Sequence, residues 1–290
     1  MTRQTSKSSS RSSSSRARRK ATKWSKRLRI PLISILVVAI AVASGLVVRR
    51  QLEIRELEAR QASLEQTYDF DPGNLISDAE FFNSSALSAK QIQKFLTAHG
   101  NKCSAKLCLK SAKFKVAHMA GDELCSEYDG KGKKLGAQVI AAAAQSCGIS
   151  PKVLLVMLEK EQGIVSTAEP TQSKYDSALG LSCPDTAACD KKYSGFFKQV
   201  YGAAKRFKYY SAHPDDYPYE ARSINYVQYH PQTACGGSNV YIENEATALL
   251  YIYTPYQPNA AALEAAWGSG DNCSSYGNRN FVLLYKAWFG

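Results

Sequence analysis

The stretch Gly148–Gly163 reads GISPKVLLVMLEKEQG and contains the clearest helix signal in the chain. Ser150 suits the N-cap of a helix, and Pro151 suits its first position because a proline there leaves no N–H unpaired. Gly163 suits the residue that ends a helix. These signals predict a helix over Pro151–Gln162.

One face of this predicted helix combines leucines with an acid. Leu154, Leu158 and Glu161 fall at i, i+4 and i+7, which places them on one stripe. Burial disfavours the charged form of a carboxyl, and glycoside cleavage requires a carboxyl that holds its proton near neutral pH. Glu161 is therefore the candidate catalytic acid, whereas Glu159, off the stripe, is expected to be an ordinary solvated carboxylate. The alternative is that Glu161 lies at a frayed helix end with its charge facing water.

The positive charge is concentrated at the beginning of the chain. Residues 1–29 hold 11 of the 37 Lys and Arg residues and no acid, so residues 30–290 carry 26 basic against 25 acidic residues. The serine-rich head cannot bury a core, and we expect it to be a disordered cytoplasmic tail. The nearly neutral remainder argues against nucleic acid as a partner, because that partner needs basic groups spread over a folded face.

An uncharged run of 19 residues, Ile30–Val48, follows this head. Its length suffices for a helix to cross the hydrocarbon layer of a membrane. Because basic residues before such a run stay in the cytoplasm, the run predicts a single-pass signal anchor in the lipid bilayer and an extracellular chain from Arg49 onward. The alternative is a secreted protein with a cleaved signal peptide, since Ala41–Ala43 (AVA) resembles a small-residue cleavage site.

All eight cysteines follow the apolar run. An even number on the extracellular side is typical of disulfides, although sequence alone leaves the connectivity open. Proximity along the chain favours the pairs Cys103–Cys108, Cys125–Cys147, Cys183–Cys189 and Cys235–Cys273. Because there is no C-x-x-C pair and the four His residues are scattered, we expect no metal site, and the even count argues against a free nucleophilic thiol.

The extracellular part divides into a predicted stalk (49–72), a small helical region (73–134) and a domain (135–290). Charged residues mixed with leucines predict a helical stalk, which the DPGN sequence at Asp71–Asn74 ends. The second region contains an amphipathic helix that starts near Ser88.

The last region has the length of a single domain. Sequence patterns predict helices over Leu135–Ser146, Pro151–Gln162, Gly195–Ser211, Asn244–Tyr253 and Ala260–Trp267. The segments INYVQYH and NVYIEN alternate apolar and polar residues around the turn-forming PQTACGGS, which predicts a small hairpin. Several helices with one hairpin predict a mainly helical α+β fold.

The stretch GISPKVLLVMLEKEQGIV resembles the catalytic helix of lytic transglycosylases of the lysozyme-like superfamily, in which a proline-led apolar helix ends in Glu, then Ser or Gln, then Gly. The segment Ala178–Ala187 (ALGLSCPDTA) is similar to the next motif of that family, and FFKQVYGAAKRFKYY is similar to the helix that follows. ATALLYIYTPYQPN resembles the Ala-Tyr-Asn segment of the family. The resemblance implies a lysozyme-like fold, Glu161 as the catalytic acid and Tyr253 near the sugar.

Further candidate substrate contacts lie near these motifs. Tyr256 belongs to a group of tyrosines in one half of the domain, and sugar faces stack on aromatic rings. Ser182 and Cys183 stand where the family has a Met-Gln pair, so the sugar-binding Gln of the family has no clear counterpart, and Ser182 is a candidate substrate contact from this segment. Asp176 is the candidate second acid, although an Asp before a turn commonly serves the turn itself.

Three functions are consistent with these expectations. The first is a membrane-anchored extracellular enzyme that cleaves the glycan strands of peptidoglycan without a cofactor. As the resemblance implies, Glu161 would protonate the leaving oxygen and then act as base while the 6-hydroxyl of the muramic acid attacks. The alternative within this function is a muramidase, which cleaves the same strands by hydrolysis and normally uses two carboxylates.

The second function is non-catalytic glycan binding or adhesion on the same scaffold, since a fold does not guarantee its chemistry. The stretches CGISPKVLL, CPDTA and YTPYQPNAAAL resemble those of secreted actinobacterial proteins described as hemagglutinin-like. A third function is docking to other cell-wall proteins, with the anchor and the stalk supplying the position.

Overall fold

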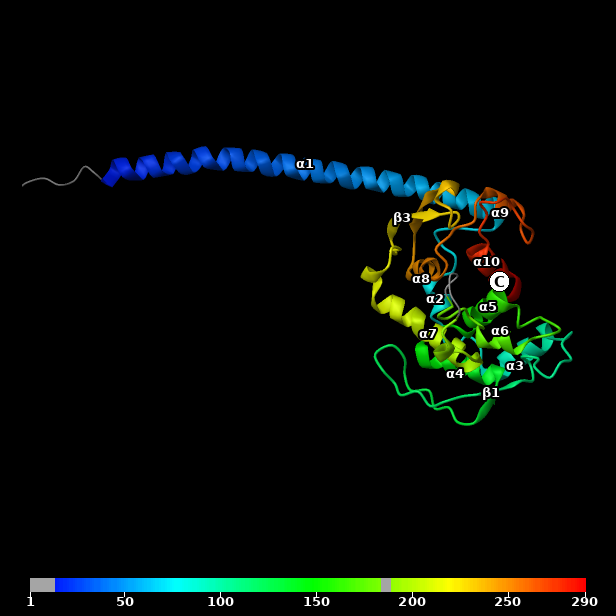
Figure 1. Ribbon diagram of the computed structural model, residues 1–290. Helices are drawn as coiled ribbons and strands as arrows, with labels where there is room; N and C mark the ends of the chain where they lie inside the picture. Colours follow the sequence, from blue (N-terminus) through cyan, green and yellow to red (C-terminus); the bar gives the residue numbers. More distant parts are fainter. Residues whose placement is uncertain (1–13, 184–188) are drawn as a thin grey trace, which may run out of the picture. The chain divides into compact units, whose positions relative to one another are not determined.

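The computed structural model (Figure 1) describes the backbone of residues 14–183 and 189–290, and within these ranges the side chains of residue 36 and of residues 38 onward. The chain forms two compact units, Met1–Glu56 and Leu57–Gly290. The helix α1 (Ser14–Tyr68) runs through the described part of the first unit and continues into the second.

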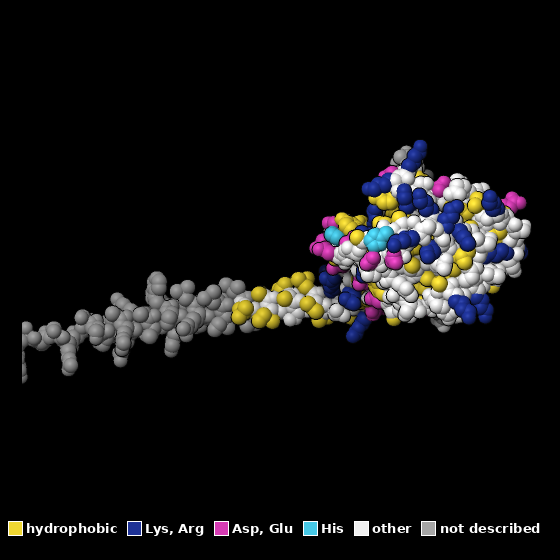
Figure 2. All heavy atoms as spheres, turned by 90° about the horizontal axis from the view of Figure 1, so that it is seen from below, with side chains coloured by type: hydrophobic (Ala, Val, Ile, Leu, Met, Phe, Trp, Pro, Cys, Tyr) yellow, Lys and Arg dark blue, Asp and Glu magenta, His cyan; other side chains and the backbone are white. Residues whose placement is uncertain are grey.

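The described part of the first unit is the long N-terminal part of α1. We expected residues 1–29 to be disordered. Residues 1–13 lie outside the described part of the chain, and from Ser14 onward the backbone is helical instead. Arg, Lys and Ala, which are frequent there, have high intrinsic helix propensity. Between Leu36 and Val48, the apolar side chains that the structure describes are highly exposed and form the yellow band on the helix in Figure 2.

Within the described residues, no helix has the length and hydropathy that a membrane crossing requires. The side chains of residues 30–35 and 37 lie outside the described part of the expected anchor. The signal anchor over residues 30–48 therefore stays a prediction.

The second unit is built mainly from helices. After α1 they are α2 (Asp78–Phe81), α3 (Ala89–His99), α4 (Gly136–Cys147), α5 (Pro151–Gln162), α6 (Gln172–Asp176), α7 (Phe196–Ala212), α8 (Glu245–Tyr253), α9 (Ala260–Glu264) and α10 (Gly277–Phe289). Short 3-10 helices are η1 (Lys191–Tyr193), η2 (Pro214–Asp216) and η3 (Thr233–Cys235). In Figure 1, α3, α4 and β1 lie at one end of this unit and β3 and α9 at the other.

Two antiparallel two-stranded sheets complete this unit. β1 (Lys113–Lys115) pairs with β2 (Lys133–Leu135), and β3 (Ser223–Gln228) pairs with β4 (Gly237–Ile242). The β3–β4 pair is the hairpin that the alternation predicted, and its turn contains η3. The β1–β2 pair, by contrast, lies in a region where we expected only a loop and helices, because its strands are too short to show a period.

The five helices predicted for residues 135–290 are present. α5 has the predicted bounds, because its signals are local: Pro151 is its first residue, and Gly163 ends it in the left-handed conformation with φ 62°. α9 ends at Glu264, earlier than predicted, since Ala266 adopts a positive φ of 47°. α10 was missed, because it begins with poor helix formers and no side chain caps it. The lysozyme-like fold itself stays a prediction.

A single hydrophobic core joins the regions 73–134 and 135–290, which we expected to be separate. Ile92 and Leu96 of α3 are fully buried in the same cluster as Ile140 of α4 and Leu154 of α5. We expected a separate stalk over 49–72, but from Leu57 onward this segment belongs to the compact second unit. Long-range packing of apolar faces, which no local pattern reveals, decides these boundaries.

Candidate functional site

The end of α5 presents Glu161 next to a lysine. The side chain of Glu161 is 26% exposed and that of Lys160 is 8% exposed, with Lys160 Nζ 2.5 Å from Glu161 Oε1. Lys160 Nζ also lies 3.5 Å from the Oγ1 of Thr254 and 5.3 Å from the ring centre of Tyr253. Glu161 is therefore partly open to solvent and partly enclosed, at the point where α5 meets the end of α8.

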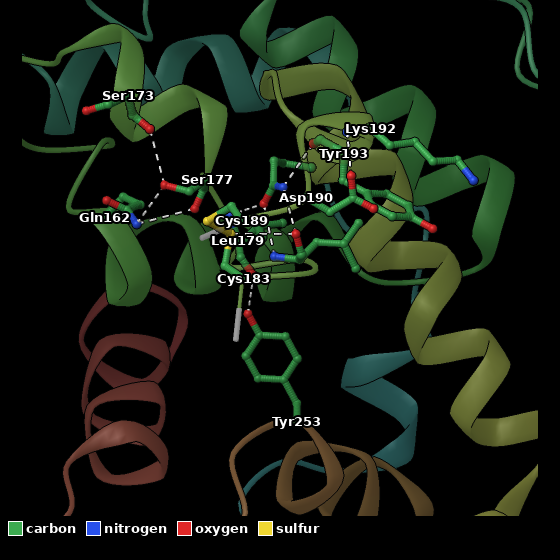
Figure 3. The surroundings of a disulfide bond; sticks show 12 residues. Gln162, Ser173, Ser177, Leu179, Cys183, Cys189, Asp190, Lys192, Tyr193 and Tyr253 are labelled. Carbon is green, nitrogen blue, oxygen red and sulfur yellow. Dashed lines mark hydrogen bonds between the residues drawn. A yellow bond between two sulfur atoms is a disulfide. The ribbon is translucent and has the colours of Figure 1, made fainter. Parts of the chain in front are cut away.

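Tyr253 is the last residue of α8, and its ring stacks on Phe207 of α7 with the centroids 5.4 Å apart. Figure 3 shows its side chain pointing from α8 to the loop before the disulfide, where its hydroxyl donates a hydrogen bond to the carbonyl of Leu179. Burial, and then the neighbouring charge of Glu161, raises the pKa of Tyr253 well above its usual range. The hydroxyl is therefore neutral at physiological pH and able to donate a hydrogen bond.

The loop after α6 supplies the third side of the site. A Cβ built at Gly180 would lie 3.8 Å from the hydroxyl of Tyr253 and 4.0 Å from Oε2 of Glu161. Gly180 adopts a left-handed conformation with φ 62°, which glycine tolerates without strain. The backbone of this loop thus approaches Glu161 without a side chain between them.

Gln199 on α7 holds this loop, and the sequence analysis missed it. The residue is fully buried, and its Oε1 accepts hydrogen bonds from the N–H groups of Leu179 and Leu181, both at 3.1 Å. Its Nε2 donates to the carbonyls of Leu181 at 3.1 Å and Tyr193 at 3.0 Å. On α7, Gln199 is a polar residue on the apolar face that contains Phe196. A polar residue on an apolar helix face is also the pattern that singled out Glu161, so this pattern could have found Gln199.

The other predicted contacts bond to partners other than Glu161 in the described residues. Asp176 accepts a hydrogen bond from Gln172 at 3.0 Å within α6. Ser182 has a positive φ of 57°, and its carbonyl accepts from the N–H of Asp190 at 2.9 Å. Tyr256 forms an isolated parallel bridge to Gln228 of β3. In the described residues, no hydrogen bond or ion pair joins any of these three predicted side chains to Glu161.

Glu159 differs from its expectation as a solvated bystander. Its Oε2 accepts hydrogen bonds from the backbone N–H groups of Val165 at 3.0 Å and Ser166 at 3.1 Å, and its Oε1 accepts from the hydroxyl of Ser166 at 2.5 Å. Because α5 ends at Gly163, the chain folds back and offers these N–H groups to the carboxylate. Glu159 therefore fastens the turn after α5.

Two of the cavities among the described residues border α7. The smaller, of about 470 Å³, lies beside α7 and is lined by Leu181 and Tyr209 among others, and the larger, of about 980 Å³, lies between β1 and the start of α7. Glu161 lines neither. Tyr201 lines the larger cavity, and its buried hydroxyl has no hydrogen-bond partner among the described residues.

The cysteines form the four bonds that proximity favoured: Cys103–Cys108, Cys125–Cys147, Cys183–Cys189 and Cys235–Cys273. The disulfide Cys183–Cys189 closes the segment that follows the loop at Gly180, as Figure 3 shows. In the part of the chain that the structure describes, no three or more His, Cys, Asp or Glu residues are placed to hold a metal ion.

These disulfides and the largely helical unit define the class of the protein: it is an extracellular, disulfide-bonded protein. The chain belongs to the LasA N-terminal domain family, whose model (LasA, N-terminal domain) matches residues 74–290. No curated protein and no solved structure matches the chain. The family match covers both regions that the common core joins, whereas the resemblance to lytic transglycosylases stays a prediction.

Proposed function

We propose that this extracellular protein acts on the glycan strands of peptidoglycan and cleaves them with Glu161 as the group that transfers the proton. The observation that carries the proposal is the meeting of three segments at this carboxylate. Glu161 is partly exposed, the neutral hydroxyl of Tyr253 lies beside it, and the backbone at Gly180 approaches both without a side chain. A sugar could reach the carboxylate from the open side.

Lys160 occupies one oxygen of this carboxylate, with its Nζ 2.5 Å from Oε1 of Glu161. In this proposal Lys160 turns away so that the leaving oxygen of the sugar can reach Glu161 and take the proton. Because no second carboxylate contacts Glu161 in the described residues, internal attack by a sugar hydroxyl fits this site better than hydrolysis by paired acids.

The test is the release of soluble fragments from purified peptidoglycan by the full-length chain. Glu161→Gln keeps the shape of the side chain but removes the transferable proton, so activity should fall by roughly two to four orders of magnitude. The matched control is Glu169→Gln, because Glu169 is exposed and its side chain forms no hydrogen bond or ion pair within the described residues. Mass spectrometry of the products distinguishes a ring-closed anhydro sugar from the hydrated sugar, which is one water heavier. Equal activity of the Glu161→Gln and Glu169→Gln variants would contradict the proposal.

The ion pair itself favours a second candidate function, non-catalytic glycan binding or adhesion. With Lys160 Nζ at one of its oxygens, Glu161 can accept hydrogen bonds from sugar hydroxyls without taking part in proton transfer. In that case the full-length chain would sediment with peptidoglycan and release nothing over a wide pH range. Loss of sedimentation in Glu161→Ala, with retention in Glu169→Ala, would locate the binding at this site.

We also propose that residues 30–48 anchor the chain in the lipid bilayer with the C-terminal unit outside, close to the wall. The exposed apolar side chains between Leu36 and Val48 support this placement, because a solvated helix gains nothing from such a surface. Protease added to cells stripped of wall should digest the chain after Arg49 and spare an epitope placed before Arg29. Digestion of that epitope would reverse the orientation, and recovery from the medium of a chain shortened near Ala43 would indicate a secreted form.

A further inference from the structure

The larger cavity, away from Glu161, carries positive charge. Its described lining contains five lysines and no acid, the lysines being Lys113, Lys115, Lys192, Lys198 and Lys205. Among them Lys205 is paired with Asp122, whereas the two lysines of β1 are exposed and make no ion pair in the described structure. Figure 2, which views the unit from the side on which β1 lies, shows Lys and Arg side chains across much of this face. The charge of the cavity therefore favours an anionic ligand.

One wall of this cavity is a strand with an unpaired edge. β1 contributes Lys113, Phe114 and Lys115 to the lining, and the lining continues through Val116 and Ala117. β2, the partner of β1, contributes no lining residue, and the described part of the sheet has no third strand. The cavity thus borders the edge of β1 that faces away from β2.

The register shows which backbone groups of β1 point to this edge. Lys115 lies opposite Lys133, and the N–H of Val116 donates to the carbonyl of Gly132 at 3.0 Å. Bonded and non-bonded residue pairs alternate in an antiparallel ladder, so the N–H and C=O of Lys113 and Lys115 point away from β2. The outward groups of Lys113 and those of Lys115 are two residues apart along β1, which is the spacing at which an added strand forms its hydrogen bonds.

The side chains at the same two positions specify the ligand. Side chains of alternate residues in a strand share one face, and the burial of β1 follows this rule. Phe114 packs inward against Phe196, with the ring centroids 4.1 Å apart, so Lys113 and Lys115 project together to the exposed face. An extended peptide with acidic residues at alternate positions would match both the backbone groups and the charges.

We propose that β1 binds an acidic, extended peptide segment of a partner protein by strand addition along the basic cavity. Backbone hydrogen bonds from Lys113 and Lys115 would supply the affinity, and their ammonium groups, with those of Lys192 and Lys198, would select acidic side chains. This interaction surface is separate from Glu161, so it is independent of the proposed glycan cleavage.

The test uses the full-length chain in mild detergent and a fluorescein-labelled hexapeptide of alternating Glu and Val, with binding followed by fluorescence anisotropy. Lys113→Glu with Lys115→Glu should weaken binding at least 10-fold. The matched control is Lys90→Glu with Lys94→Glu, which makes the same change in net charge on the exposed face of α3 and should leave binding unchanged. Circular dichroism verifies that both double variants are folded.

A second probe tests the backbone pairing. Two versions of the same peptide carry N-methyl groups on alternate residues, one version on the Glu residues and the other on the Val residues. Each version keeps its charge but cannot donate hydrogen bonds along one edge. The version methylated on the edge that faces β1 should bind at least 10-fold more weakly. Equal binding of both methylated peptides, or an equal loss in the Lys90 and Lys94 control, would overturn strand addition. Tighter binding of inorganic polyphosphate than of the peptide would overturn the peptide as ligand and identify a general polyanion site. Failure of the labelled peptide to bind the wild type at low salt would overturn the proposal altogether.

Discussion

At the scale of single residues, two glutamates of α5 have different roles although they are two positions apart. Glu159 folds back onto the N–H groups of the turn after the helix, whereas Glu161 meets Lys160 and lies beside Tyr253 and Gly180. The helix separates them by about 200° of rotation, so one side chain faces the returning chain and the other faces the site.

Because Glu159 holds the turn after α5, its removal should lower the stability of the fold without removing a group of the candidate site. Glu159→Ala removes the acceptor for the N–H groups of Val165 and Ser166, and hydrogen bonds to a charged group contribute about 1.5–3 kcal/mol each at most. We expect the free energy of unfolding to fall by about 1–3 kcal/mol in urea titrations, and by less in Glu159→Gln, which keeps one acceptor oxygen. An unchanged unfolding midpoint in Glu159→Ala would show that the turn does not depend on the carboxylate.

Gln199 carries a sharper prediction for the loop. Gln199→Leu keeps the volume but leaves the N–H groups of Leu179 and Leu181 without their acceptor, and a buried unpaired group costs about 1–3 kcal/mol. Hydrogen exchange of a peptide covering residues 178–183 should accelerate, and the free energy of unfolding should fall by at least about 2 kcal/mol. Val200→Leu on the same helix is the control for altered packing alone. Native-like exchange in Gln199→Leu would contradict a role for Gln199 in positioning the loop.

At the scale of elements, the side chain of Gln61 joins the end of α1 to the β3–β4 hairpin. Gln61 accepts from the N–H of Tyr241 at 2.8 Å and donates to its carbonyl at 3.2 Å, as a neighbouring strand would. The buried carboxylate of Asp71 accepts from the N–H of Gly73 at 2.7 Å and shapes the turn that follows α1. Local sequence predicted the turn, but not its attachment to the hairpin.

The turn at Asp71 should make stability depend on pH. Burial raises the pKa of Asp71 above its ordinary value of 3.8, against the opposing effect of the bond from Gly73. The folded state therefore binds this proton more readily than the unfolded state, so its contribution to stability is present below pH 3.8 and is lost as pH rises through the folded-state pKa. The melting temperature of Asp71→Asn, measured relative to that of wild type, should therefore increase as the pH rises from 3 to 7.

The control for this prediction is Asp129→Asn, an exposed change of the same type. Calorimetry of both variants across the same pH range isolates the contribution of Asp71. If the difference between Asp71→Asn and wild type is constant with pH, or reverses in sign, the protonation of Asp71 is not what varies.

At the scale of the whole molecule, one core and four disulfides hold the second unit together. The core includes residues from α3 and from α10, although these helices lie far apart in the sequence. Phe95 of α3 lies 5.2 Å from Phe289 of α10 between ring centroids, in a stacked arrangement. The regions before and after residue 135 therefore depend on each other for folding.

Removal of disulfides should rank by the length of chain that each one closes. Cys235 and Cys273 are 38 residues apart, and the loop-closure estimate gives about 4 kcal/mol for this bond. Cys183 and Cys189 are 6 apart, for which the same estimate gives about 2 kcal/mol. Paired Cys→Ala variants unfolded in guanidinium should show the larger loss for Cys235 and Cys273. The reverse order would mean that native packing around the bonds outweighs the entropy of the unfolded chain.

The sequence by itself determined the features that depend on neighbours in the chain. The bounds of α5 follow from a proline and a glycine, and the β3–β4 hairpin follows from an alternating pattern. Short separations favoured the observed disulfide pairs but left the connectivity open. It also singled out Glu161 and Tyr253, which the structure brings to one place, because both stand in recognisable segments. Caps and turns act over a few residues, and such signals can be read before any packing is known.

Only the tertiary structure decided the rest. It replaced two expected regions with one core, gave Glu159 a structural role and introduced Gln199 as the support of the loop. It joined none of Asp176, Ser182 and Tyr256 to Glu161 by a hydrogen bond or ion pair in the described residues. These outcomes depend on where distant segments bring their backbone groups and apolar faces. A residue pattern records which face is apolar, but the partner of that face is set by packing across the whole unit.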